Sequence, residues 1–145
     1  LTVEENMRLA SASGEFDKDR LARIFSIFPA MQKFWANQAY ALSGGQKQML
    51  AISRAIIEKR DLILIDEPTK GLAPSIIRNM IDAFREIGTE TTILLVEQNF
   101  HFAKALGRGV GVIDDGRIVH KGQMADLAAD AELQTRLLGL TAEAH

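Results

Sequence analysis

The stretch Leu42-Ser43-Gly44-Gly45-Gln46 is the most informative part of this sequence. Ser43 is a good helix N-cap and Gln46 falls at the third helical position, so the pair predicts a capping box at a helix start. Two glycines in a first turn weaken a helix by about 1 kcal/mol each relative to alanine, and capping does not need them. Without side chains, they would let an anion reach the free amides at the positive end of the helix dipole. The stretch alone therefore leaves phosphate binding and simple capping both open.

A second stretch, Leu62-Ile63-Leu64-Ile65-Asp66-Glu67-Pro68, joins an apolar tetrad to two carboxylates. The apolar run predicts a strand that is buried on both faces of a parallel sheet. Ligands of such sheets gather beyond the carboxyl ends of the strands, where Asp66 and Glu67 fall. One carboxylate could hold Mg²⁺ through water, and the other could orient or deprotonate an attacking water. The alternative is a solvated acidic turn that caps a helix; the tetrad before the pair and residues 69–74 after it favour the first interpretation.

Helical and strand patterns alternate around these two stretches. Apolar periodicity, caps, prolines and glycines predict helices at residues 3–10, 19–28, 44–59, 74–87, 99–106, from 124 and from 131 to 139. Residues 30–41 are a short helix or a loop. Strands are predicted at residues 62–65, 92–96, 110–113 and 117–119, with Asp115-Gly116 as the hairpin turn. The order predicts an α/β fold in which a helical part precedes a parallel sheet with flanking helices and a small antiparallel hairpin at its edge.

The composition is that of an ordinary globular domain. The chain has 145 residues, of which 47% are hydrophobic and 25% charged, enough for one modest domain with a core. The net charge of −2 lacks the excess of positive charge that is typical of nucleic-acid-binding domains, so we expect no nucleic-acid partner. The chain has no cysteine, which excludes disulfides and thiolate metal sites. His101 and His120 are far apart with no obvious third ligand, so we expect no histidine metal site.

Several motifs, taken together, resemble the ATP-binding domain of ABC transporters. Leu42 to Gln46 resembles the ABC signature motif, and Leu62 to Pro68 resembles the Walker B segment. Lys70-Gly71-Leu72-Ala73-Pro74 resembles the D-loop of the branched-chain amino acid transport ATP-binding subfamily, and Leu94-Leu95-Val96-Glu97-Gln98-Asn99 resembles its switch segment. Two further stretches fit the same pattern: Asp115-Gly116-Arg117-Ile118-Val119 and Leu138-Gly139-Leu140. The resemblance covers essentially the whole chain, from just after the Q-loop.

The resemblance implies a partial P-loop NTPase fold. Residues 1–58 would form the helical signature subdomain, and residues 59–145 the C-terminal part of the RecA-like ATPase core. No Gly-x-x-x-x-Gly-Lys-Ser/Thr sequence (Walker A) occurs in the chain, which begins with Leu1 rather than Met, and we therefore expect an excised C-terminal portion. We expect this chain alone to bind ATP weakly and not to hydrolyse it. Exposed sheet edges and apolar surface would favour self-association.

The resemblance also implies roles for individual residues. Asp66 would help to hold Mg²⁺, and Glu67 would be the general base that polarises the attacking water. Gln98 occupies the position where most ABC domains have a switch histidine. A glutamine can donate a hydrogen bond to the γ-phosphate but cannot take up a proton.

The signature residues would serve a neighbouring subunit. Ser43, Gly44 and Gly45, with Gln46, would contact the γ-phosphate of an ATP that is bound mainly by another ATP-binding subunit. The implied partners are that second ATP-binding subunit, in a homodimer or heterodimer, and transmembrane permease subunits, with a periplasmic solute-binding protein acting indirectly. The location would be cytoplasmic, on the inner face of the cell membrane. Phe34 or Trp35, beside a predicted aromatic core of the helical part, could touch the permease.

The implied function is that of an ATP-hydrolysing subunit of an ABC importer. It would energise uptake of branched-chain amino acids or related small polar solutes. Three alternatives stay open: an importer of urea or short amides, a non-transport ABC ATPase that acts on DNA or ribosomes, and a truncated interaction module without catalysis. The slight acidity of the chain argues against the ATPases that act on nucleic acid.

Overall fold

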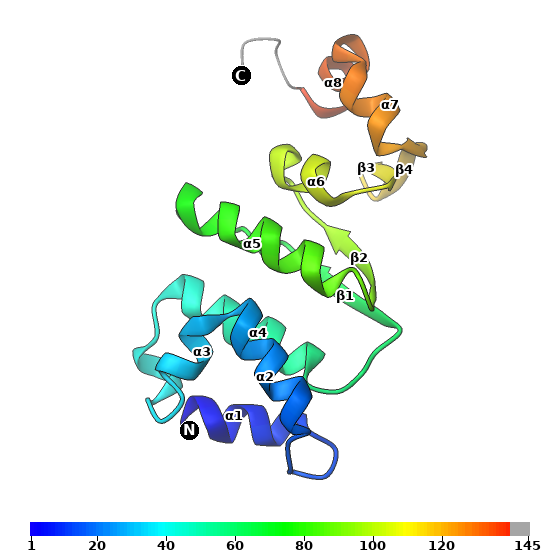
Figure 1. The fold of residues 1–145 in the computed structure, drawn as a ribbon. Helices are drawn as coiled ribbons and strands as arrows, with labels where there is room; N and C mark the ends of the chain where they lie inside the picture. The colour runs from blue at the N-terminus through cyan, green and yellow to red at the C-terminus, as the bar shows by residue number, and fades with distance from the viewer. Residues whose placement is uncertain (140–145) are drawn as a thin grey trace. The chain divides into compact units, whose positions relative to one another are not determined.

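The chain folds into two compact units in a computed structural model that describes residues 1–139 (Figure 1). The first unit is Leu1–Gln98, and the second begins at Asn99. The predicted boundary between residues 58 and 59 falls within the first unit and stays a prediction. Among the described residues, no helix is long and apolar enough to cross a membrane.

The first unit begins with helices and continues into a strand–helix–strand crossover. In chain order it contains α1 (Val3–Ala10), α2 (Lys18–Ile27), α3 (Pro29–Lys33), the 3-10 helix η1 (Ala39–Ala41), α4 (Gly44–Ile56), β1 (Leu62–Asp66), α5 (Pro74–Ile87) and β2 (Thr92–Val96). The segment 30–41 thus contains two short helical pieces. Helix α4 ends earlier than predicted, at Ile56, whose carbonyl accepts a hydrogen bond from the Arg20 guanidinium at 2.7 Å. Because the Arg20 side chain already gives this carbonyl a hydrogen-bond partner, the helix does not have to continue for another turn to supply one.

Strands β1 and β2 pair in parallel, with Leu64 opposite Leu94 and Asp66 opposite Val96. Their side chains alternate between a covered and an exposed face: Ile63 is 6% exposed, whereas Leu64 is 70% exposed. The prediction of a strand that is buried on both faces is therefore wrong for this structure. Within residues 1–139 the parallel sheet has two strands, and only one of its faces is covered. The exposed face, here called the outer face, carries Leu62, Leu64, Leu94 and Val96.

The helical part of the first unit has its own apolar core. Met7 on α1, Ile24 on α2 and Met31 on α3 are almost completely buried. The predicted aromatic core is confirmed for Phe28, which is also buried. The ring of Trp35 is half-buried and packs edge-on against two phenylalanines, with centroid distances of 5.5 Å to Phe16 and 5.1 Å to Phe25.

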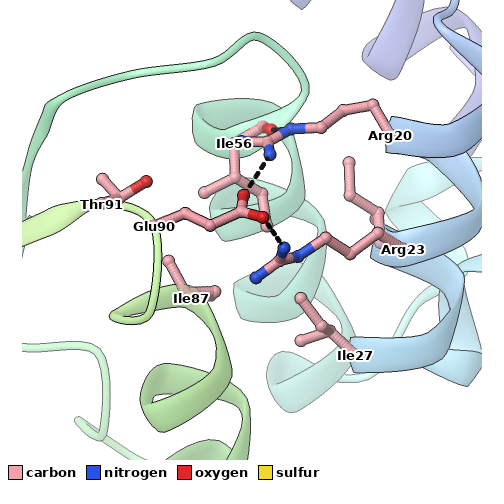
Figure 2. Close-up of a pocket in the computed structure, with 8 residues that line it drawn as sticks. Arg20, Arg23, Ile27, Ile56, Ile87, Glu90 and Thr91 are labelled. Carbon is pink, nitrogen blue, oxygen red and sulfur yellow. Dashed lines mark hydrogen bonds and ion pairs between the residues drawn. The ribbon is translucent and has the colours of Figure 1, made fainter.

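Two arginines of α2 tie the helical part to the turn between α5 and β2, as Figure 2 shows. Arg20 and Arg23 both form ion pairs with Glu90, the Arg20 pair at 2.9 Å. Arg23 also reaches Glu86, with 3.3 Å between the charged atoms, and donates to the hydroxyl of Thr89 at 3.2 Å. These contacts join segments far apart in the sequence, so they stabilise the way α2 sits on the end of α5.

The second unit is built around a hairpin. It contains α6 (Phe100–Leu106), β3 (Gly109–Asp114), β4 (Arg117–Gln123), α7 (Met124–Ala129) and α8 (Ala131–Leu138). Asp115 and Gly116 have positive φ values of 45° and 73°, as a two-residue hairpin turn requires. The hairpin forms a separate two-stranded sheet and not the edge of the parallel one. Its core includes Val112, Met124 and Leu127.

The end of α8 agrees with the prediction. Gly139 caps this helix in the left-handed conformation, with φ 65°. Leu140, the last residue of the Leu-Gly-Leu stretch, and His145 lie outside the described residues.

Candidate functional site

The carboxyl ends of β1 and β2 bring the predicted catalytic residues together. Because the two strands are parallel and in register, the residues that follow Asp66 and Val96 leave the sheet side by side. The Glu67 amide continues the ladder one step further and donates to the Val96 carbonyl at 2.8 Å. Glu67 and Gln98 therefore face each other where parallel α/β sheets place their ligands.

Both carboxylate oxygens of Glu67 have partners. The Gln98 Nε2 amide donates to Oε1 at 2.7 Å, and the Lys70 ammonium lies 3.2 Å from Oε2. The Glu67 side chain is partly exposed, and Lys70 is largely in solvent. The carboxylate is thus held in one orientation while solvent still reaches it. Two predicted catalytic residues, Glu67 and Gln98, are in direct contact.

The backbone of Glu67 has an unusual conformation. Its φ is +44°, a left-handed value that is uncommon outside glycine. For a residue with a side chain, this conformation costs about 1–2 kcal/mol. The Glu67 carbonyl accepts from the Lys70 amide at 3.2 Å, which closes a turn directly after the strand. Backbone outliers that surrounding contacts hold in place are concentrated at functional sites.

A second pair of side chains crosses between the same two segments. Glu97 Oε1 accepts two hydrogen bonds from Thr69, one from the backbone amide at 3.0 Å and one from the hydroxyl at 2.5 Å. Thr69 is buried, at 6% exposed. Sequence reasoning missed this pair and the Lys70 contact. The available signal was the position of Thr69 and Glu97, each a few residues beyond one of two consecutive strands predicted in the same parallel sheet.

Asp66 is the residue that could hold Mg²⁺. It lies exposed at the end of β1, next to Glu67. Within residues 1–139, no three His, Cys, Asp or Glu residues are grouped so as to hold a metal ion. Mg²⁺ is usually bound through one or two carboxylates, with waters and substrate phosphates as the other ligands. The exposed carboxylate of Asp66 fits that mode of binding.

The signature stretch forms the start of α4, as predicted. Ser43 is the N-cap, and its hydroxyl accepts from the Gln46 amide at 3.3 Å, while the Gln46 side chain accepts from the Ser43 amide at 2.9 Å. A Cβ on Gly44 would have no heavy atom within 4 Å, whereas one on Gly45 would lie 3.2 Å from Ile76. Packing among the described residues therefore explains why position 45 has no side chain, but it does not explain why position 44 has none.

Among residues 1–139, the signature residues and the carboxylates make no direct polar contact. Within this described range, no hydrogen bond or ion pair joins Ser43–Gln46 to Asp66, Glu67 or Gln98. A partly open cavity beside Arg20 and Glu90 has a volume of about 10 Å³, which is room for about one water molecule.

Comparisons with known proteins point to one family. Residues 1–70 match the family model described as ABC transporter, and this range includes both the signature stretch and Glu67. Residues 1–70 thus carry the ABC transporter domain that this model describes, and the relatives below are similar over most of the chain. Gln98 lies beyond the matched range of this ABC transporter domain, so its assignment depends on its own motif and on its contact with Glu67.

Curated relatives that are similar to this chain include ATP-binding proteins named for amino-acid transport. The chain is 38% identical to the high-affinity branched-chain amino acid transport ATP-binding protein BraG of Pseudomonas aeruginosa, over 96% of the chain and 61% of BraG. It is 31% identical to LivF of Archaeoglobus fulgidus, whose name also refers to branched-chain amino acid transport, over 97% of the chain and 61% of LivF. It is 35% identical to the methionine import ATP-binding protein MetN of Photobacterium profundum, over 88% of the chain and 39% of MetN. The chain thus spans about three-fifths of the length of its branched-chain relatives.

Solved structures agree on the fold. An ATP-binding cassette of an ABC transporter superposes with a TM-score of 0.72 at 21% sequence identity, over 92% of this chain and 61% of that one. The ATP-binding subunit of another ABC transporter superposes with the same TM-score of 0.72 at 25% identity, over 97% of this chain and 59% of that one. The fold of this chain is therefore similar to that of ABC ATP-binding domains.

Proposed function

We propose that this chain is the signature, Walker B and switch part of an ATP-binding subunit of an ABC importer. The complete subunit would hydrolyse ATP to energise uptake of branched-chain amino acids or a related small polar solute. The observation that carries the proposal is the setting of Glu67, a carboxylate at the end of a parallel strand that Gln98 and Lys70 hold from two sides. The similarity to BraG supports the choice of solute class.

Glu67 is the general base of the proposed reaction. Its carboxylate accepts a proton from the water that attacks the γ-phosphate, or polarises that water as the bond forms. Gln98 cannot take the proton, but its amide nitrogen carries two N–H donors. One of them holds Glu67, so the other can bond to the γ-phosphate. A single side chain would then set the distance between the base and the phosphate.

Asp66 would hold Mg²⁺ next to this base. When bound, the ion supplies positive charge that neutralises the β- and γ-phosphate oxygens. Asp66 is the last paired residue of β1, opposite Val96, so its position is set by the sheet. This rigid support is what a residue needs if it is to orient a metal ion for chemistry.

The signature residues would act on an ATP that is held mainly by a second ATP-binding subunit. The space beside Gly44 leaves room for a phosphate to approach the N-terminus of α4. The capping box of Ser43 and Gln46 keeps that first turn formed before the partner arrives. We propose that two such subunits enclose the nucleotide, that permease subunits bind them at the inner face of the membrane, and that a periplasmic solute-binding protein acts through the permease.

The test is ATP hydrolysis by the full-length product of the coding sequence that contains Leu1–His145. Glu67→Gln keeps the size of the side chain and removes the base, so we expect kcat to fall by about 10²-fold or more. Glu132→Gln, an exposed change on α8, is the matched control and should leave the rate unchanged. An active Glu67→Gln protein would refute the role of Glu67. A clear rate from the 145-residue chain alone, abolished by Glu67→Gln, would overturn the expectation that this part is inactive.

A further inference from the structure

The pair formed by Thr69 and Glu97 lies beside the proposed base and does not belong to the roles assigned so far. Thr69 follows Glu67 by two residues, and Glu97 immediately precedes Gln98. Two hydrogen-bonded side-chain pairs therefore link the same two segments, Glu67 with Gln98 and Thr69 with Glu97. Glu97 and Gln98 of the switch segment thus hold the turn that follows β1 at two points, Thr69 and Glu67.

The geometry of the Thr69–Glu97 pair makes it a firm anchor. One carboxylate oxygen of Glu97 accepts both the amide and the hydroxyl of Thr69, at 3.0 and 2.5 Å. Hydrogen bonds to an ionised acceptor are shorter and stronger than neutral ones. Thr69 is buried, so water does not easily replace its partner.

The anchor also explains how Glu67 can keep a left-handed backbone. The φ of +44° at Glu67 is unfavourable for a residue with a side chain, and such a conformation persists only where its surroundings hold it. On one side, the Glu67 amide is bonded to the Val96 carbonyl at 2.8 Å. On the other side, the Thr69 amide is bonded to Glu97 at 3.0 Å, and within the turn the Glu67 carbonyl accepts from the Lys70 amide. The turn at Glu67 is thus held from both ends by the switch segment.

We propose that Glu97 is a positioning residue that, through Thr69, keeps Glu67 and Gln98 in the geometry needed for hydrolysis. Glu97 does not touch ATP in this proposal; it determines where the base and the switch amide lie relative to each other. The inference rests on the proposed role of Glu67 as the base. A purely structural role for the pair would affect the stability of the chain but not the chemical step.

Four substitutions separate the two roles. Thr69→Val removes the hydroxyl donor and keeps the shape of the side chain, while Thr69→Ser keeps the donor. Glu97→Asp keeps the charge but withdraws the acceptor by one methylene. Thr92→Val, on an exposed position of β2, is the matched threonine control.

The first measurement uses the ¹⁵N-labelled 145-residue chain. We expect the side-chain amide signals of Gln98 to shift in Thr69→Val and in Glu97→Asp, and to stay in place in Thr69→Ser and Thr92→Val. Unchanged Gln98 signals in both of the first two variants would overturn the proposal. This outcome does not depend on whether the chain hydrolyses ATP, so it is independent of the proposed function.

The second measurement is ATP hydrolysis by the full-length product. We expect kcat to fall by about tenfold to a hundredfold in Thr69→Val and in Glu97→Asp. The KM for ATP should stay within about twofold, because the pair does not bind the nucleotide. Thr69→Ser should restore kcat. The double variant should lose about as much as either single one, since both changes break the same contact.

The outcomes distinguish the two proposals. Wild-type kcat in Thr69→Val and Glu97→Asp, when Glu67→Gln is inactive, would overturn the positioning role and leave the base in place. An active Glu67→Gln protein would overturn the role of Glu67 as the base, on which the positioning role rests. An absence of ATP hydrolysis by the wild-type full-length product would overturn the proposed function itself. A lowered urea midpoint with unchanged kcat would assign the pair to stability alone and so also overturn the positioning role. If Thr69→Val does not fold, the kcat of Glu97→Asp, which weakens the contact, is compared with that of Thr69→Ser, which keeps it.

Discussion

Alanine substitutions at two neighbouring positions, Ile63 and Leu64, test the one-sided sheet directly. Ile63 points to the covered face of β1 and is 6% exposed, whereas Leu64 points to the outer face and is 70% exposed. The two residues have the same number of side-chain carbons and lie on the same strand. The difference between their costs therefore reports mainly on burial and not on size, with a smaller contribution from the higher strand propensity of the β-branched Ile63.

The magnitudes follow from the exposed fractions. Truncating a buried isoleucine to alanine costs about 2–5 kcal/mol, because it loses transfer free energy and leaves a cavity. Complete burial of a leucine side chain is worth about 1.5–3 kcal/mol. Leu64 has lost only about a third of its exposure, so Leu64→Ala should cost about 0.5–1 kcal/mol. We expect Ile63→Ala to be the more destabilising change by at least about 1 kcal/mol.

Urea unfolding followed by tryptophan fluorescence measures both variants. Trp35 is the single tryptophan and lies in the first unit, so the signal reports on the unit that contains β1. The free energies of unfolding should be compared at a concentration where sedimentation shows a monomer. Equal losses for the two variants under that condition would refute the one-sided sheet. A Leu64→Ala cost that grows with protein concentration would show that a second copy covers the outer face, as exposed apolar surface predicts.

Three further predictions concern other parts of the chain. Gly44→Ala should raise the urea midpoint of unfolding, because a Cβ there meets no other atom and alanine favours a helix over glycine by about 0.5–1 kcal/mol. Gly45→Ala should not raise it, because its Cβ would lie 3.2 Å from the side chain of Ile76 on α5. Glu90→Gln weakens ion pairs with two arginines of α2, so it should lower stability by about 1 kcal/mol in low salt and by less in 1 M NaCl. The hydrogen bond from the Thr2 amide lowers the pKa of Glu5, so this capping bond should hold above the usual glutamate range and be lost as the pH falls through the lowered pKa, which the Thr2 amide signal in NMR would report. Glu5→Gln should remove that acid transition of the Thr2 amide signal, and an unchanged transition would contradict it.

Local signals in the sequence were sufficient for the ends of helices and for the hairpin. Thr2 and Glu5 form the capping box that their spacing predicts, and so do Ser43 and Gln46. Asp115-Gly116 forms the predicted turn. These features depend on residues a few positions apart and on backbone preferences of single residues, so no tertiary contact is needed to predict them.

The pairing of Glu67 with Gln98 was predictable only in outline. The sequence places both residues just beyond strands, and parallel strands bring their carboxyl ends together. The 2.7 Å contact itself depends on the register of β1 and β2, which the runs Leu62–Ile65 and Ile93–Val96 do not specify because all their residues are hydrophobic.

The amino-acid sequence by itself determined the family resemblance, the order of helices and strands, and the residues able to carry the chemistry, because motifs, caps and turns are local. Only the tertiary structure decided that Leu64 lies on an exposed face and that Thr69 is anchored on Glu97. Burial depends on which layers cover a sheet, and a side-chain pair depends on which strands are neighbours and in what register. Both are properties of the assembled fold, in which residues far apart in the chain come into contact.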